Sequence, residues 1–167
     1  NDGIKSDKNY QLVKKALLQK VRSEKVRTDF TEMLIWLFIQ NHQFKMALLQ
    51  AKALDKRTNS HGEGVYDLAD SFLDKEYYDV AIEAYDYVIQ KGKQNYLYID
   101  ANINKLYALT KSLSSSNNDI SILEGAYHQL ITELGNNRST VILLSNYAHF
   151  KAFYLHDLEA AETLLLD

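Results

Sequence analysis

Residues 78–85 read Tyr78-Asp79-Val80-Ala81-Ile82-Glu83-Ala84-Tyr85, a stretch in which two aromatic residues and the alanine between them share one helical face. The same series stands 34 positions earlier as Phe44, Ala47 and Ala51, and 34 positions earlier again as Tyr10, Val13 and Leu17. A second series repeats at the same interval and pairs Leu34 with Leu68, Ile35 with Ala69, and Phe38 with Phe72. A period of 34 residues predicts stacked helical hairpins, because one hairpin cannot bury its apolar face alone.

Capping signals divide the chain into helices. Thr28 is expected to cap a helix that opens with Asp29, and Ser60 is expected to form a capping box with Glu63. Glycines at positions 92 and 135 are typical of residues just past a helix end. No alternating strand pattern competes with this interpretation, so the expected fold class is all-α. The expected helices cover residues 10–25, 30–40, 44–57, 61–75, 78–91, 96–113, 120–134, 139–155 and 158–166.

The chain resembles the tetratricopeptide repeat (TPR) family most closely at Val65, Leu68, Ala69 and Phe72, followed by Tyr78, Ala81, Tyr85 and Val88. The family's unit is a pair of antiparallel helices, A and B. The resemblance implies an α–α superhelix, a right-handed solenoid of stacked antiparallel helix pairs. A serine- and asparagine-rich loop at 114–118, followed by Asp119 as the next cap, accounts for about eight inserted residues in the third copy.

Under this resemblance residues 1–167 form a single TPR-like array, expected to be a slice of a longer protein. Its parts are helix B of a preceding repeat (10–27), two repeats (28–59 and 60–93), an irregular repeat with an inserted loop (95–135) and a partial repeat (138–167).

Composition restricts the function classes. The net charge of −3 argues against nucleic-acid binding, and the absence of cysteine excludes disulfides and thiolate chemistry. Charge is unevenly distributed, since residues 1–59 carry a net +6 and residues 60–167 a net −9. Such asymmetry marks a partner surface or the solvated faces of long helices. The longest apolar run, 33–39, is far shorter than the ~20 residues of a membrane span.

No catalytic or metal-binding motif is present. The five histidines are scattered, without the spacing of a zinc protease motif, and no phosphate-binding glycine loop occurs. We therefore expect no enzymatic activity and no cofactor. An abundance of Lys, Asn, Ile and Tyr is typical of AT-rich bacterial genomes. It suggests a bacterial source with a periplasmic or envelope location, and a cytoplasmic location is the alternative.

The first functional hypothesis is a protein–protein interaction scaffold. In TPR proteins the A helices line a concave groove that holds the ligand. The apolar residues beside acidic ones at the groove positions of this chain suit a protein or peptide partner with apolar anchors and some basic residues. The alternative hypothesis is a structural spacer or assembly segment of a larger bacterial envelope or regulatory protein, its groove filled by its own chain. The implied groove residues are Met33, Trp36, Ile39, Glu63, Tyr66, Asp67, Asp70 and Asp74.

Overall fold

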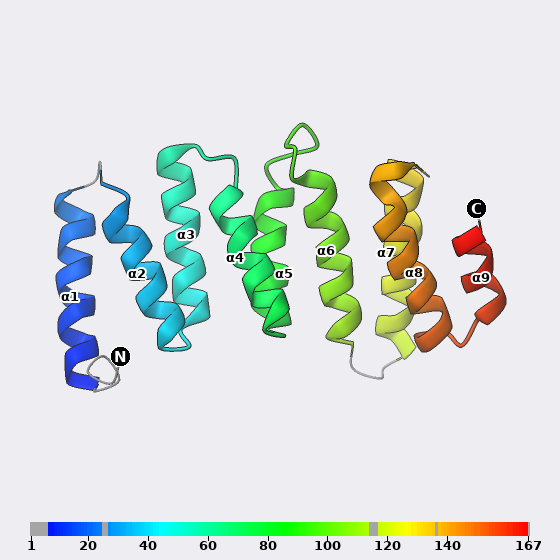
Figure 1. Cartoon of the computed structure of the whole chain (residues 1–167), viewed down its shortest axis with the longest axis horizontal. Coiled ribbons are helices and arrows are strands. Elements are labelled where there is room, and N and C mark those ends of the chain that lie inside the picture. Colours follow the sequence, from blue (N-terminus) through cyan, green and yellow to red (C-terminus); the bar gives the residue numbers. More distant parts are fainter. Residues whose placement is uncertain (1–6, 25–26, 114–116, 136, 167) are drawn as a thin grey trace. The chain divides into compact units, whose positions relative to one another are not determined.

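The computed structural model describes residues 7–24, 27–113, 117–135 and 137–166. Within them the protein is all-helical, with nine α-helices, one short 3-10 helix (η1, Arg138–Thr140) and no strand (Figure 1). This confirms the all-α fold class. The helices are α1 (Asp7–Ser23), α2 (Asp29–Gln40), α3 (Phe44–Thr58), α4 (Glu63–Asp74), α5 (Tyr78–Ile89), α6 (Tyr98–Lys111), α7 (Asn117–Leu134), α8 (Val141–Tyr154) and α9 (Leu158–Leu166).

The chain divides into two compact units, and the boundary along the sequence falls within α4. The first runs to Leu68 and the second begins at Ala69. Each unit has its own apolar core.

The first unit packs α1 against α2 and α2 against α3, with successive helices antiparallel (Figure 1). Leu34, Phe38 and Ala47 are fully buried at the centre of this unit. The fully buried Ala47 lies where the repeat pattern predicts a small residue, because small side chains let two helices approach closely. Tyr10 is also buried, and its hydroxyl donates to Gln43 Oε1 at 2.7 Å.

The same tight turn follows α2 and α4, and a related turn follows α8, where the donor Leu155 precedes the left-handed residue instead of following it. In each, one residue adopts a left-handed backbone: His42 (φ 56°), Glu76 (φ 62°) and His156 (φ 56°). In each, a backbone N–H also donates to the carbonyl five residues earlier. The three pairs are Gln43 to Phe38 at 2.8 Å, Tyr77 to Phe72 at 2.9 Å, and Leu155 to Phe150 at 3.3 Å. The first two turns are 34 residues apart, so the sequence period is also a period of backbone geometry.

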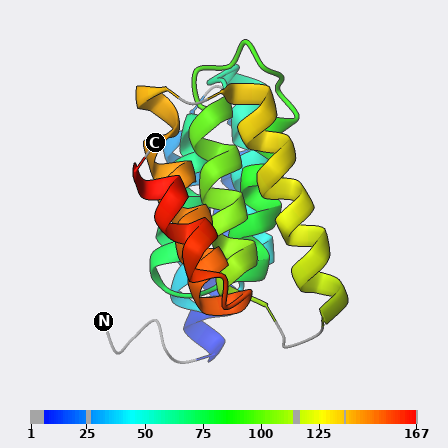
Figure 2. The ribbon, with the colours of Figure 1, turned by 90° about the vertical axis from the view of Figure 1, so that its right-hand side faces the viewer.

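The second unit packs α5 against α6 and α8 against α9, and α7 also contacts α6 and α8 (Figure 2). Its core contains a row of aromatic rings. Tyr127 of α7 stacks on Tyr147 and Phe150 of α8, with ring centroids 5.0 and 5.5 Å apart. The remaining fully or largely buried core residues are Ile103, Leu106, Leu123, Leu130 and Leu143.

Several expected helix ends were wrong by a few residues. The helix expected from 61 begins at Glu63, because the Ser60 hydroxyl donates to Asp55 Oδ1 at 3.0 Å instead of capping. Thr28 stands at the N-cap of α2 as expected, but its side chain makes no cap hydrogen bond. The start of α7 at Asn117 puts Asp119 in its first turn, and residues 114–116 of the expected loop lie outside the described residues.

Other expectations about helix ends and register were confirmed or only partly met. Gly92 and Gly135 follow helices with φ of 99° and 75°, which confirms both predicted glycine ends. The repeat series at Tyr10 is less regular than the later copies, because Val13 is 39% exposed.

Candidate interaction cleft

The first unit contains an open cleft of about 530 Å³ between α2 and α3. We call it the α2–α3 cleft. One wall comes from α2, whose cleft residues recur at helical spacing: Thr28 before its first turn, then Glu32, Ile35, Trp36 and Ile39. The other wall comes from α3 and the segment that follows it: Ala51, Leu54, Asp55, Thr58, Ser60 and Gly64.

The cleft is apolar because α2 is apolar nearly all round. Leu34, Leu37 and Phe38 fill the core of the unit, so the remaining large residues must lie on other faces. Trp36 is 48% exposed and Met33 is 55% exposed. Trp36 adjoins Ile35 and Ile39 on the cleft wall, and a contiguous exposed apolar surface of this kind is typical of interaction sites.

Asp55 anchors the polar end of the cleft. This carboxylate is only 2% exposed, and its Oδ1 accepts hydrogen bonds from the Gly62 backbone N–H at 2.6 Å and from the Ser60 hydroxyl at 3.0 Å. Gly62 adopts φ 94°, a conformation that favours glycine. Because its carboxylate is held in this way, Asp55 shapes the turn before α4 and fixes one end of the cleft.

Glu32 supplies the exposed charge at the cleft. Its side chain lies on the α2 wall, and within the described residues it has no hydrogen-bond or ion-pair partner. The neighbouring carboxylate, Asp29, is paired instead, since the hydrogen bond from Arg27 holds the pKa of Asp29 below its usual range. Glu32 is therefore the carboxylate at this surface that an incoming cation can reach at little desolvation cost.

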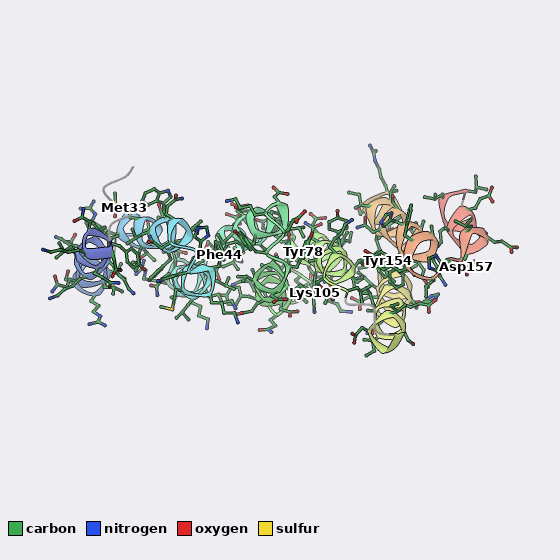
Figure 3. The ribbon with its side chains drawn as sticks, turned by 90° about the horizontal axis from the view of Figure 1, so that it is seen from below. Met33, Phe44, Tyr78, Lys105, Tyr154 and Asp157 are labelled. Carbon is green, nitrogen blue, oxygen red and sulfur yellow. The ribbon has the colours of Figure 1, made fainter. Side chains whose placement is uncertain are left out.

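The predicted groove residues of the first unit lie in different environments. Trp36 and Ile39 line the α2–α3 cleft. Met33 is exposed on the side of α2 that faces away from α3 (Figure 3) and is not part of the cleft wall. Among the predicted α4 residues Glu63 and Asp67 are exposed, and Tyr66 is half-buried.

The predicted residues of the second unit, Asp70 and Asp74, differ from each other. Asp74 is exposed, whereas Asp70 is half-buried. Asp70 Oδ1 accepts hydrogen bonds from the hydroxyl of Tyr85 on α5 and from Asn104 Nδ2 on α6, the latter at 3.1 Å. Asp70 therefore links three helices of this unit, and its carboxylate is committed to the fold.

The sequence pattern missed the α3 wall of the cleft. Ala51 was interpreted only as a repeat position, and Asp55 was not singled out. One signal was present, because Asp55 falls four residues after Ala51 on the helix face that otherwise carries buried apolar residues. A carboxylate at such a position needs hydrogen-bond donors and so marks a polar feature inside the fold.

A second cleft, of about 500 Å³, lies in the second unit among α7, α8 and α9. Two pairs of polar groups from α7 and α8 interact at this cleft. Tyr147 Oη lies 2.8 Å from His128 Nε2, and Lys151 Nζ donates to Glu124 Oε1 at 2.6 Å. That hydrogen bond raises the pKa of Lys151, and burial raises the pKa of the Tyr147 hydroxyl. The mutual pairing explains how these groups tolerate partial burial and gives the cleft a structural role.

Within the described ranges no three His, Cys, Asp or Glu side chains are grouped so that they could hold a metal ion. Over the same residues, none of the helices is both long and apolar enough to cross a membrane. No protein-family model, no curated protein and no solved structure matches the chain. The α2–α3 cleft is therefore interpreted from its own geometry.

Proposed function

We propose that this chain is a non-enzymatic protein-interaction scaffold that binds a segment of a partner protein at the α2–α3 cleft. The observation that carries the proposal is the open apolar cleft of about 530 Å³ with Trp36 half exposed on its wall. The proposal includes a TPR-like, right-handed solenoid arrangement of the helix pairs. The 34-residue repetition of the turns after α2 and α4 supports that arrangement.

The chemistry of the walls defines the partner. Trp36, Ile35 and Ile39 offer apolar area to one bulky side chain, whose burial contributes about 1.5–3 kcal/mol. Tryptophan is common among residues that dominate binding energy, because it buries a large area with few rotatable bonds. The preferred partner segment therefore carries an aromatic or branched aliphatic anchor.

The acidic groups select the flanking residues of that segment. Glu32 lies on the cleft wall, and Glu63 and Asp67 are exposed at the start of α4 in the same unit. Exposed charges of one sign mainly accelerate association and set orientation, and contribute less to affinity than the apolar anchor does. We expect Lys or Arg next to the anchor, and we expect salt to weaken binding.

The test is selection from a random peptide library displayed against the purified chain. Enriched peptides should share a bulky apolar residue with a basic neighbour, and Trp36→Ala should weaken their binding by about tenfold or more, as for interface hot spots. Leu49→Ala is the matched control, because Leu49 is an exposed apolar residue (55%) of the same unit outside the cleft wall. Peptides that bind Trp36→Ala as tightly as the wild type would show that this cleft is not the binding site.

The spacer hypothesis makes a different prediction for the same selection. Exposure of both Met33 and Trp36 also suits a helix covered by another part of its own protein. In that case random selection gives no peptide that depends on Trp36, and only segments of the longer protein bind the chain. The selection therefore distinguishes the two functions.

A further inference from the structure

Helix α9 has an apolar and acidic outer face. Leu158 and Leu165, seven residues apart, are 71% and 65% exposed, and Leu166 is 79% exposed. Glu162 lies between the two leucines on the same face, and Glu159 lies at the border between this face and the cleft among α7, α8 and α9. The inward face carries the smaller Ala160 and Ala161, which pack toward the rest of the second unit. In Figure 2 α9 lies in front of α8, with its outer face toward the viewer.

Helix α1 has an outer face of the opposite charge. Lys8, Lys15 and Arg22 recur at seven-residue intervals, which places them in one stripe. Leu12, 59% exposed, lies beside this stripe. Within the described residues, none of these three cations has a hydrogen-bond or ion-pair partner, and neither do the side chains of Glu159 and Glu162. The opposite side of α1 packs on α2 through Tyr10.

We propose that copies of this chain associate head to tail, with α9 of one copy packed against α1 of the next. Leu158 and Leu165 would cover Leu12, and the α9 carboxylates would pair with the basic stripe. Second copies fit better than an unrelated partner because one chain supplies both complementary faces. The contact does not involve the α2–α3 cleft, so the inference is independent of the proposed function.

The size of the faces predicts a weak association. A helix of nine residues is about 14 Å long, so the contact falls among interfaces below about 1,200 Å², which are typically transient. Because two different faces meet, each copy can bind one neighbour on either side. We therefore expect reversible growth with concentration and no single stable dimer.

The first experiment is sedimentation equilibrium of the full chain from about 10 to 500 μM, which brackets the affinities expected of small interfaces. The average mass should rise above the 19.3 kDa of one chain as concentration increases. Raising the salt from about 0.1 to 1 M shortens the Debye length from about 10 to 3 Å and should shift the rise to higher concentration. A chain that stays at 19.3 kDa throughout would overturn the proposal.

Two variants isolate the faces. Lys15→Glu with Arg22→Glu reverses the α1 stripe, and Leu158→Ser with Leu165→Ser removes the apolar part of the α9 face. All four side chains are exposed, so both variants should fold, as judged by unchanged helical circular dichroism. Each variant alone should remain monomeric. Their mixture should form a 1:1 complex and nothing larger, because each variant keeps the one face that the other lacks.

A control with the same charge reversal uses Lys45→Glu and Lys56→Glu, two exposed lysines on α3. This control should associate like the wild type. Loss of association in the control, or a mixture of the two face variants that stays monomeric, would overturn the α9–α1 contact. Growth that persists in both face variants alone would assign the association to a different surface and would equally overturn it.

Discussion

Tyr127 should reverse the sign of its contribution to stability between neutral and alkaline pH. Its side chain is fully buried, and its hydroxyl lies 2.9 Å from Thr110 Oγ1. Thr110 donates its own proton to the Leu106 carbonyl at 2.9 Å, so Tyr127 is the donor in this pair. Burial raises the pKa of Tyr127 to about 12.

At pH 7 the variant Tyr127→Phe should be less stable by about 1 kcal/mol. The variant loses one buried hydrogen bond, whose net contribution is about 0.5–1.5 kcal/mol. The aromatic stack with Tyr147, at 5.0 Å between ring centroids, stays in place because the phenyl ring is retained. The neutral-pH effect therefore reports the hydroxyl alone.

At alkaline pH the order should invert. Because the pKa of Tyr127 is raised in the folded chain, the unfolded chain loses the tyrosine proton at a lower pH than the folded chain does. The stability that Tyr127 contributes is therefore complete below pH ~10 and is lost as pH rises toward ~12. One pKa unit corresponds to about 1.4 kcal/mol, so by pH ~11 the wild type has lost about that much from this residue. Phenylalanine does not titrate, and the variant should therefore match or exceed the wild type at pH ~11 and above.

The assay is urea unfolding followed by far-ultraviolet circular dichroism at pH 7, 10 and 11. Tyr96→Phe makes the same chemical change at a residue of the second unit that is 63% exposed, and should show no inversion. If the stability difference between wild type and Tyr127→Phe is the same at all three pH values, the buried-hydroxyl argument is refuted.

Three further substitutions test the packing and the turns by urea unfolding. Ala81→Leu should cost about 1–3 kcal/mol, because Ala81 is fully buried, whereas Ala53→Leu at an exposed site of α3 should change little. Glu76→Gly should stabilise by about 1 kcal/mol, since glycine relieves the left-handed backbone, and a destabilised variant would contradict the turn geometry. Asp55→Ala should cost about 1–3 kcal/mol by leaving the buried Gly62 N–H without its acceptor; Asp55→Asn, which keeps Oδ1, should recover most of this.

The sequence predicted the helices well because packing imposes a strict period on them. Leu34, Phe38, Ala47 and Ala81 all fall at repeat positions, and all are fully buried in the structure. The predicted glycine ends were also right at positions 92 and 135. The left-handed residues His42 and Glu76 were not foreseen, because the expected signal for that conformation is glycine or asparagine.

Boundary errors arose where side chains had a choice of partners. Ser60 can cap α4 through its own hydroxyl, but it donates to Asp55 five residues earlier. A capping motif in the sequence predicts only the hydrogen bond between the serine hydroxyl and the start of the helix. It does not show that a nearby buried carboxylate competes for the same hydroxyl. The predicted site was incomplete for a related reason. Trp36 and Ile39 were found on the A helix that the family resemblance indicated, but the α3 wall was assigned wholly to packing.

The acidic residues Asp67, Asp70 and Asp74 of α4 show most clearly where the sequence period stops being informative. Spacing places Asp67, Asp70 and Asp74 on neighbouring positions of α4, and nothing in the spacing separates them. The structure separates them, because Tyr85 and Asn104, which are 15 and 34 residues away from Asp70, donate to its carboxylate. A carboxylate that already accepts two hydrogen bonds gains little from a partner's cation, since the new pair would have to replace donors that hold the fold together. The charge available for binding in the first unit therefore lies with Glu32, on the apolar cleft that Trp36 and Ile39 line, and with the exposed Asp67 of α4.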